Sequence, residues 1–294
     1  MSADPTLHRR VQAPAVRALP FRTPAVRTSS TRALAARPVA VLAAAGLALT
    51  ACSVGPEAES AGGAQGAGPS SSVTQAAPTA LNLGDRPDQV MAEAAAARAA
   101  TFGFIRQQAA SAEEIRTARE DGRARAEDTG RTEVAPEVCA APLAALDFSP
   151  ILLDQEQASR VDVGAESFQG TGTVEVARLD GPGRQQVERH LQTVNRLLTD
   201  CGRMEMTVHE GGTSTVYVVQ ADAAALSEGS PAQSGLVWRR TRTGQGAPEL
   251  TAQVLTAVTP DEVVMVSFAG QPAVGERQFT LMAEEVLAAA LRAG

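Results

Sequence analysis

The chain has 294 residues, which is enough for one or two domains. Its 26 basic residues are all Arg and are outnumbered by 33 acidic residues, so the net charge is −7. Residues 1–51 hold seven Arg and one acid, a net of +6, which leaves −13 for the remainder. A chain this acidic repels phosphate backbones, and this excludes nucleic acid as a partner.

An apolar run of twelve residues, 38–49, follows Arg32 and Arg37. As a helix, the run would cover roughly 18 Å of a hydrocarbon core that is about 30 Å thick. A basic segment followed by an apolar run too short to span a bilayer is typical of an export signal. The sequence therefore predicts an exported protein and no permanent transmembrane helix in this segment.

The apolar run ends in Leu49-Thr50-Ala51-Cys52, which resembles the lipobox of bacterial lipoproteins. The resemblance implies that residues 1–51 are removed as a signal peptide and that Cys52 becomes a lipidated, palmitate-bearing N-terminus. Several acyl chains hold a protein stably on a bilayer, so we expect anchoring on the outer face of the cell membrane. An ordinary secretory signal with an incidental cysteine is the alternative.

Residues 52–83 form a low-complexity linker after the anchor, rich in Gly, Ala, Ser and Pro. Such a composition cannot bury enough apolar surface to offset the entropy of ordering. We expect a disordered tether, and the 28 residues from 53 to 80 would have a root-mean-square span of about 30 Å.

Residues 84–133 are expected to be helical and partly charged. Pro87 begins an Ala-rich helix that runs to about Gln108, and Ser111 with Glu114 forms the capping box of a second helix that ends near Asp128. The second helix consists mostly of charged residues, so it is either a partner-docking arm or a solvated helix. We favour the solvated helix.

The compact domain is predicted to span residues 134–294. Apolar spacing predicts a central helix over 184–200 and a C-terminal helix over 278–291, and Pro136 opens a short helix. Strand-like runs occur at 160–163, 173–179, 204–209, 213–220, 235–240, 250–258 and 262–268. The fold class is α+β, with one mainly antiparallel sheet of about five to six strands and helices packed on it.

The chain has three cysteines, and if Cys52 carries lipid, Cys139 and Cys201 remain as an even pair. An exported domain is in an oxidising compartment, so we expect these two cysteines to form a disulfide, although two buried free thiols are the alternative. They are far apart in sequence, and none belongs to a C-x-x-C motif. We therefore expect no metal site and no cofactor.

A lipobox, a tether, a Pro136-to-Cys139 helix, a helix ending in Cys201 and an antiparallel sheet together resemble actinobacterial envelope lipoproteins. More loosely, residues 136–292 are similar to the extracellular sensor domain of the mycobacterial serine/threonine kinase PknH. The resemblance implies a sensor-like extracytoplasmic domain. The sensor domain of that kinase has two disulfides, whereas this chain can form only one, so its ligand-binding cleft is not carried over to this chain.

Catalytic motifs are missing from the sequence. Outside the signal only His190 and His209 could supply acid–base chemistry near neutral pH, and both fit structural positions. Nucleophile elbows, P-loops, zinc-protease motifs and EF-hand loops do not occur. We therefore expect no catalytic residues and no enzymatic activity.

Trp238, followed by Arg239 and Arg240, is the candidate site for contact with a ligand or partner, although a core Trp on one sheet face is the simpler interpretation. The leading hypothesis is a non-enzymatic, membrane-anchored envelope lipoprotein with a sensor-like domain that binds a small ligand. The alternative is an adaptor that docks an envelope protein through its sheet edge or charged helix. A hydrolase is third, and acidic residues converging on His209 in a pocket would favour it.

Overall fold

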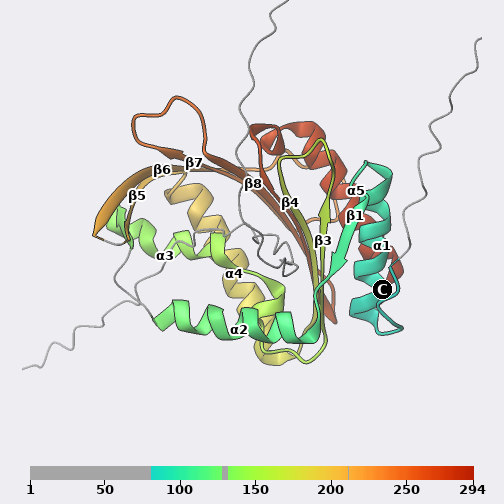
Figure 1. Ribbon diagram of the computed structural model, residues 1–294. Coiled ribbons are helices and arrows are strands. Elements are labelled where there is room, and N and C mark those ends of the chain that lie inside the picture. Colours follow the sequence, from blue (N-terminus) through green and yellow to red (C-terminus); the bar gives the residue numbers. More distant parts are fainter. Residues whose placement is uncertain (1–80, 128–131, 211) are drawn as a thin grey trace, which may run out of the picture. The chain divides into compact units, whose positions relative to one another are not determined.

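The structure, a computed structural model, describes residues 81–127, 132–210 and 212–294 (Figure 1). The predicted signal peptide (residues 1–51), the predicted lipidation site Cys52 and residues 53–80 of the predicted linker lie outside the described residues. Within these ranges no helix is both long enough and apolar enough to cross a membrane.

The fold is built on a single nine-stranded sheet in which every neighbouring pair is antiparallel. The strand order is β1-β3-β4-β9-β8-β7-β6-β5-β2. The strands are β1 (Arg106–Ala109), β2 (Thr132–Ala135), β3 (Ala158–Gly164), β4 (Gly170–Arg178), β5 (Arg203–Glu210), β6 (Thr213–Ala223), β7 (Ser234–Arg242), β8 (Leu250–Val258) and β9 (Glu262–Gly270). The antiparallel sheet is confirmed, but the expected number of five to six strands was wrong.

The outermost strand β1 and the first half of β2, the other outermost strand, come from the segment that was expected to be helical. The first helix ends at Thr101 rather than near Gln108, because Gly103 adopts a φ of +93° and turns the chain into β1. Strand β1 then pairs with β3, and β2 pairs with β5. The expected domain boundary near residue 134 therefore falls inside β2, and residues 84–133 contribute to the same sheet as the rest.

Helices cover both faces of this sheet (Figure 1). The α-helices are α1 (Pro87–Thr101), α2 (Ala112–Glu127), α3 (Ala140–Leu143), α4 (Gly181–Asp200) and α5 (Arg277–Ala293). Short 3-10 turns are η1 (Glu137–Cys139), η2 (Ala144–Asp147), η3 (Pro150–Leu152) and η4 (Pro272–Gly275). Helices α1 and α5 pack against each other and against one face, and α4 crosses the opposite face with α2 and α3 beside it.

The strand pleat divides the core between the two faces. On the α1/α5 face, Val174 and Val176 of β4 and Phe268 of β9 pack against the small side chains of α1. On the α4 face, Val194 and Leu197 lie in an apolar cluster over β5 to β8. A second cluster on that face gathers around Val187 with residues from α2, η3, β4 and β9. Helix α4 therefore contributes to two separate cores.

The charged helix α2 is attached to the domain. The Arg119 guanidinium donates hydrogen bonds to the carbonyl oxygens of Ile151 (2.7 Å) and Gln155 (2.6 Å), and Ile115 is buried. The capping box also forms, since the Ser111 amide donates to the Glu114 carboxylate at 2.7 Å and the Glu114 amide donates to the Ser111 hydroxyl at 3.2 Å. One side of α2 is exposed and the other holds η3 in place.

Candidate functional site

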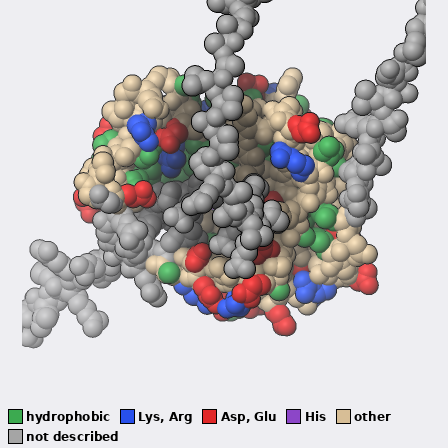
Figure 2. Space-filling model, in the orientation of Figure 1, with side chains coloured by type: hydrophobic (Ala, Val, Ile, Leu, Met, Phe, Trp, Pro, Cys, Tyr) green, Lys and Arg blue, Asp and Glu red, His purple; other side chains and the backbone are tan. Residues whose placement is uncertain are grey.

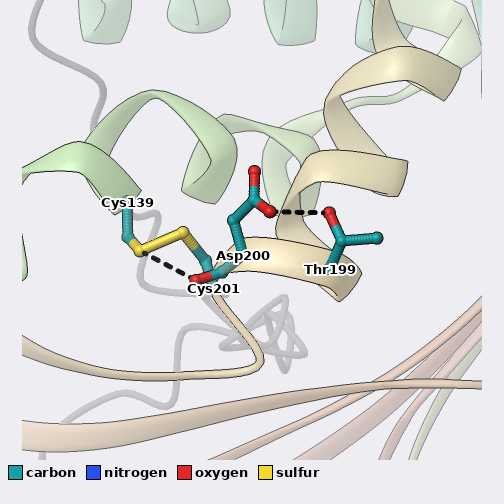
Figure 3. Close-up of a disulfide and its surroundings, with 4 residues drawn as sticks. All are labelled: Cys139, Thr199, Asp200 and Cys201. Carbon is teal, nitrogen blue, oxygen red and sulfur yellow. Dashed lines mark hydrogen bonds between the residues drawn. A yellow bond between two sulfur atoms is a disulfide. The ribbon is translucent and has the colours of Figure 1, made fainter.

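Helix α4 is fixed at its C-terminal end by a disulfide. Cys201 directly follows α4, and its sulfur bonds to that of Cys139 at the end of η1, at an S–S distance of 2.03 Å (Figure 3). Both cysteines are buried, and Thr199 and Asp200 make a side-chain hydrogen bond of 3.0 Å on the adjoining turn. The bond predicted between Cys139 and Cys201 is therefore present.

The N-terminal end of α4 is held by side chains. The Asp180 carboxylate caps the helix by accepting a hydrogen bond of 2.6 Å from the Gly183 amide. The Arg184 guanidinium reaches the turn between β8 and β9, where it donates to the carbonyl oxygens of Thr259 (3.5 Å) and Pro260. Helix α4 is thus attached to the rest of the domain at both ends.

An open groove lies between the first half of α4 and the β8–β9 turn. Its volume is about 660 Å³, within the range of small-molecule sites. Val187, Leu191 and Val258 make it partly apolar, whereas Glu188 and Gln233 add polar groups. The groove is lined by Arg184, Val187, Glu188, Leu191, Gln233, Val258, Thr259 and Pro260. This chemistry suits a ligand with an apolar body and hydrogen-bonding groups.

A charged cluster in which Glu175 is buried and Arg160 and Asp162 are partly exposed lies on the same face of the sheet, on β3 and β4. The Arg160 Nε donates to Asp162 at 2.8 Å, and Arg160 Nη1 lies 3.6 Å from the Glu175 carboxylate. Burial raises the pKa of the Glu175 carboxyl, while Arg160 and the Ser149 hydroxyl, which donates to it, oppose that rise. Because Ser149 precedes η3, the cluster attaches this turn to the sheet.

His190 lies on α4 beside the groove residue Leu191, but it is not poised for proton transfer. Its ring stacks on Phe148 with centroids 3.8 Å apart and an interplanar angle of 13°. Burial lowers the pKa of His190 to about 4, so the imidazole is neutral at physiological pH. His190 therefore acts as a packed aromatic side chain.

His209 has the partners that a hydrolase would need, in an open location. Its Nδ1 lies 2.8 Å from the Ser214 hydroxyl across the β5–β6 pair, and its Nε2 lies 3.5 Å from a carboxylate oxygen of Glu133 on β2. The groove is built from α4 and the β8–β9 turn, so this trio does not line it. The Glu133 carboxylate is exposed, so the trio lies at the surface.

The structure places Trp238 and its two arginine neighbours on different faces of β7. Trp238 is only 4% exposed and belongs to the apolar cluster under the second half of α4. Arg240, on the same face, lies 4.7 Å above the Tyr217 ring. Arg239 points to the opposite face and pairs with Asp222 at 2.8 Å. The three candidate residues do not form one site.

Sequence reasoning missed the groove and the charged cluster. The groove combines α4 with a turn some 70 residues later, and only Pro260 in a Thr-Pro-Asp turn indicated that this turn was well defined. The sequence could have indicated that Glu175 is unusual, because it is a charged residue between the apolar Val174 and Val176 in a predicted strand. Within the described ranges, no three His, Cys, Asp or Glu side chains gather closely enough to hold a metal ion.

Comparisons with known proteins give a structural similarity and no family. No protein-family model matches the chain, and no curated protein matches it either. Among solved structures, the chain is similar to the extracellular domain of PknH from Mycobacterium tuberculosis, with a TM-score of 0.36 and 12% sequence identity. The similarity covers 56% of this chain and 80% of that domain.

Proposed function

We propose that the protein is a non-enzymatic, lipid-anchored envelope lipoprotein whose extracytoplasmic domain binds a small amphipathic ligand in a sensor-like manner. The observation that carries the proposal is the groove between α4 and the β8–β9 turn, which combines apolar and hydrogen-bonding side chains. The buried Cys139–Cys201 disulfide supports an oxidising compartment for this domain.

The firm attachment of α4 supports the binding role. A groove wall that is pinned at both ends loses little conformational entropy when a ligand is bound, and this preorganisation favours affinity. The groove has a polar side at Gln233, whose amide nitrogen donates to the Val258 carbonyl at 2.9 Å and so holds the segment before β7 against the end of β8. A ligand therefore meets a preformed surface.

The ligand-binding part of the proposal is tested by native mass spectrometry of protein extracted from membranes. The wild type should carry an additional small-molecule mass that a Leu191→Trp variant lacks, because the larger ring fills the groove. Gln192→Trp is the matched control, since residue 192 lies on the same helix but is exposed. Equal spectra for the wild type and Leu191→Trp would contradict a ligand in the groove.

The anchoring part is tested separately with Cys52→Ala. We expect this variant to lose labelling by radioactive palmitate and to leave the membrane fraction, because it lacks the thiol that is proposed to accept the lipid. A variant that stays labelled and membrane-bound would refute lipidation at Cys52 without affecting the groove.

A further inference from the structure

Four large apolar side chains of the described residues stand out as exposed, and three of them belong to one region. Phe102 is 41% exposed, and Ile105 and Leu281 are each 40% exposed; the fourth, Val138, is 65% exposed. Phe102 and Ile105 flank the turn that joins α1 to β1, and Leu281 lies in the first half of α5. We call Phe102, Ile105 and Leu281 the apolar tip.

The pairing of α1 with α5 brings these residues together. Arg98 of α1 forms an ion pair of 3.0 Å with Glu285 of α5, and Gly294 at the end of α5 lies against Met91 near the start of α1. The two helices are therefore antiparallel (Figure 1). Phe102 follows Arg98 by one turn and Leu281 precedes Glu285 by one turn, so both lie at the same end of the helix pair.

The apolar tip has a rigid base. Phe104 follows the same turn but is buried, and its ring centroid lies 5.2 Å from that of Phe168 and 5.1 Å from that of Phe268. Phe279 of α5 joins this cluster, with its ring 5.7 Å from that of Phe268. Since the cluster already fills the interior, Phe102 and Ile105 remain outside it and are available to contact something else.

Two arginines, Arg98 and Arg277, lie beside the apolar tip in an otherwise acidic protein. Residues 94–112 contain two Arg and no acid, although the chain as a whole has a net charge of −7. The Arg98 guanidinium lies 4.8 Å above the Phe102 ring, and Arg277 precedes Leu281 by one helical turn. Arg106 lies on the opposite face of β1, where it donates to the Ala165 carbonyl oxygen at 2.8 Å. The Arg98–Glu285 pair offsets part of this charge. On the face drawn in Figure 2, acidic and basic side chains are interspersed.

We propose that the apolar tip contacts the surface of the bilayer that holds the Cys52 anchor. The proposal rests on the lipid anchoring proposed above. Apolar side chains with adjacent arginines are the chemistry of proteins that lie at a membrane interface, where the arginines meet anionic headgroups. The 28 residues between Cys52 and Leu81 span at most about 95 Å, so the tip can reach the bilayer.

Three half-exposed side chains suffice because the anchor keeps the domain close to the membrane. A contact that would be too weak between free partners becomes occupied when a tether makes it intramolecular. The tip lies about 22 Å from the first residue of α1, which is the length of that helix. Docking would therefore bring the end of the α1/α5 pair that carries the tip towards the bilayer and leave the α4 groove, on the opposite face of the sheet, open to solution.

The test measures contact depth in the full lipidated chain, reconstituted into vesicles of phosphatidylcholine and phosphatidylglycerol with or without brominated acyl chains. Phe102→Trp reports on the tip, and Val138→Trp is the matched control. Both positions are exposed, and they lie beside the two opposite edge strands of the sheet, β1 and β2. Trp238 is buried, and the unsubstituted protein gives its background.

Bromine should lower the emission of Phe102→Trp by about half, because interfacial side chains enter the headgroup and acyl boundary by about 5–10 Å. Val138→Trp should be unaffected, and adding Leu281→Asp to Phe102→Trp should remove the quenching while the protein still sediments with the vesicles. Unquenched Phe102→Trp on sedimenting vesicles, or equal quenching at both positions, would overturn the proposal. Loss of sedimentation itself would instead refute the anchor.

Discussion

The contribution of the Cys139–Cys201 disulfide can be worked out from the loop that it closes. The two cysteines are 62 positions apart, and chain-entropy bookkeeping for such a loop gives roughly 14 cal/mol/K, or about 4 kcal/mol at 25 °C. Replacing both residues by Ala, in a Cys52→Ala background that removes the third thiol, should therefore lower the free energy of unfolding by about 4 kcal/mol. For a domain of this size, that loss corresponds to a fall in melting temperature of roughly 8–16 °C.

Urea unfolding followed by circular dichroism measures this loss, and its denaturant dependence tests the cause. Removing a constraint from the unfolded chain exposes more surface on unfolding, so the slope of stability against urea should rise along with the loss of stability. Chemically reduced Cys52→Ala protein should match the double Ala variant. A loss below about 1 kcal/mol, outside the usual range for native disulfides, would refute the reasoning.

Two further predictions concern the buried titratable groups. The pKa of His190 falls from 6.5 to about 4 on folding, so its contribution is fully present above pH 6.5 and is lost as the pH drops towards 4. His190→Phe should remove that part of the pH dependence in thermal unfolding; an unchanged profile would argue against a buried neutral ring. Glu175→Ala should cost about 1–3 kcal/mol in urea unfolding, because the Ser149 hydroxyl loses its acceptor and Arg160 is left with Asp162, with Glu175→Gln costing less. The exposed Glu156→Ala is the control, and an equal cost at both positions would contradict the buried pair.

Much of the secondary structure could be predicted from local patterns. The apolar spacing of Val187, Val194 and Leu197 indicated the central helix, which the structure extends to Gly181–Asp200. The β5–β6 hairpin and the strands at 250–258 and 262–268 also matched closely. In these segments burial and backbone propensity favour the same structure, so the sequence alone is sufficient.

The edge strands could not be predicted in this way. The sequence of β1 is Arg-Gln-Gln-Ala, which has no β-branched or aromatic residue, and its extended form depends on pairing with β3 more than 50 residues later. The face that Trp238 occupies could not be predicted either. Both faces of the sheet are covered by helices, so the apolar residues of β7 are continuous and do not alternate with polar ones. The groove could not be predicted either, because only tertiary contacts bring α4 to the β8–β9 turn.

The strand order also determines the order in which strands can pair during folding. Strands β5 to β9 can pair successively with their neighbours in sequence, but β4 must wait for β9, whose Met265 faces Glu175 from 90 residues further along the chain. During synthesis from the N-terminus, β4 therefore carries an unpaired edge and uncovered valines until nearly the whole protein has emerged. Any fragment that ends before β9 lacks the strand that joins β4 to β8, and so it cannot form the continuous sheet. We therefore expect truncated chains to be degraded in the cell rather than to persist as partly folded domains.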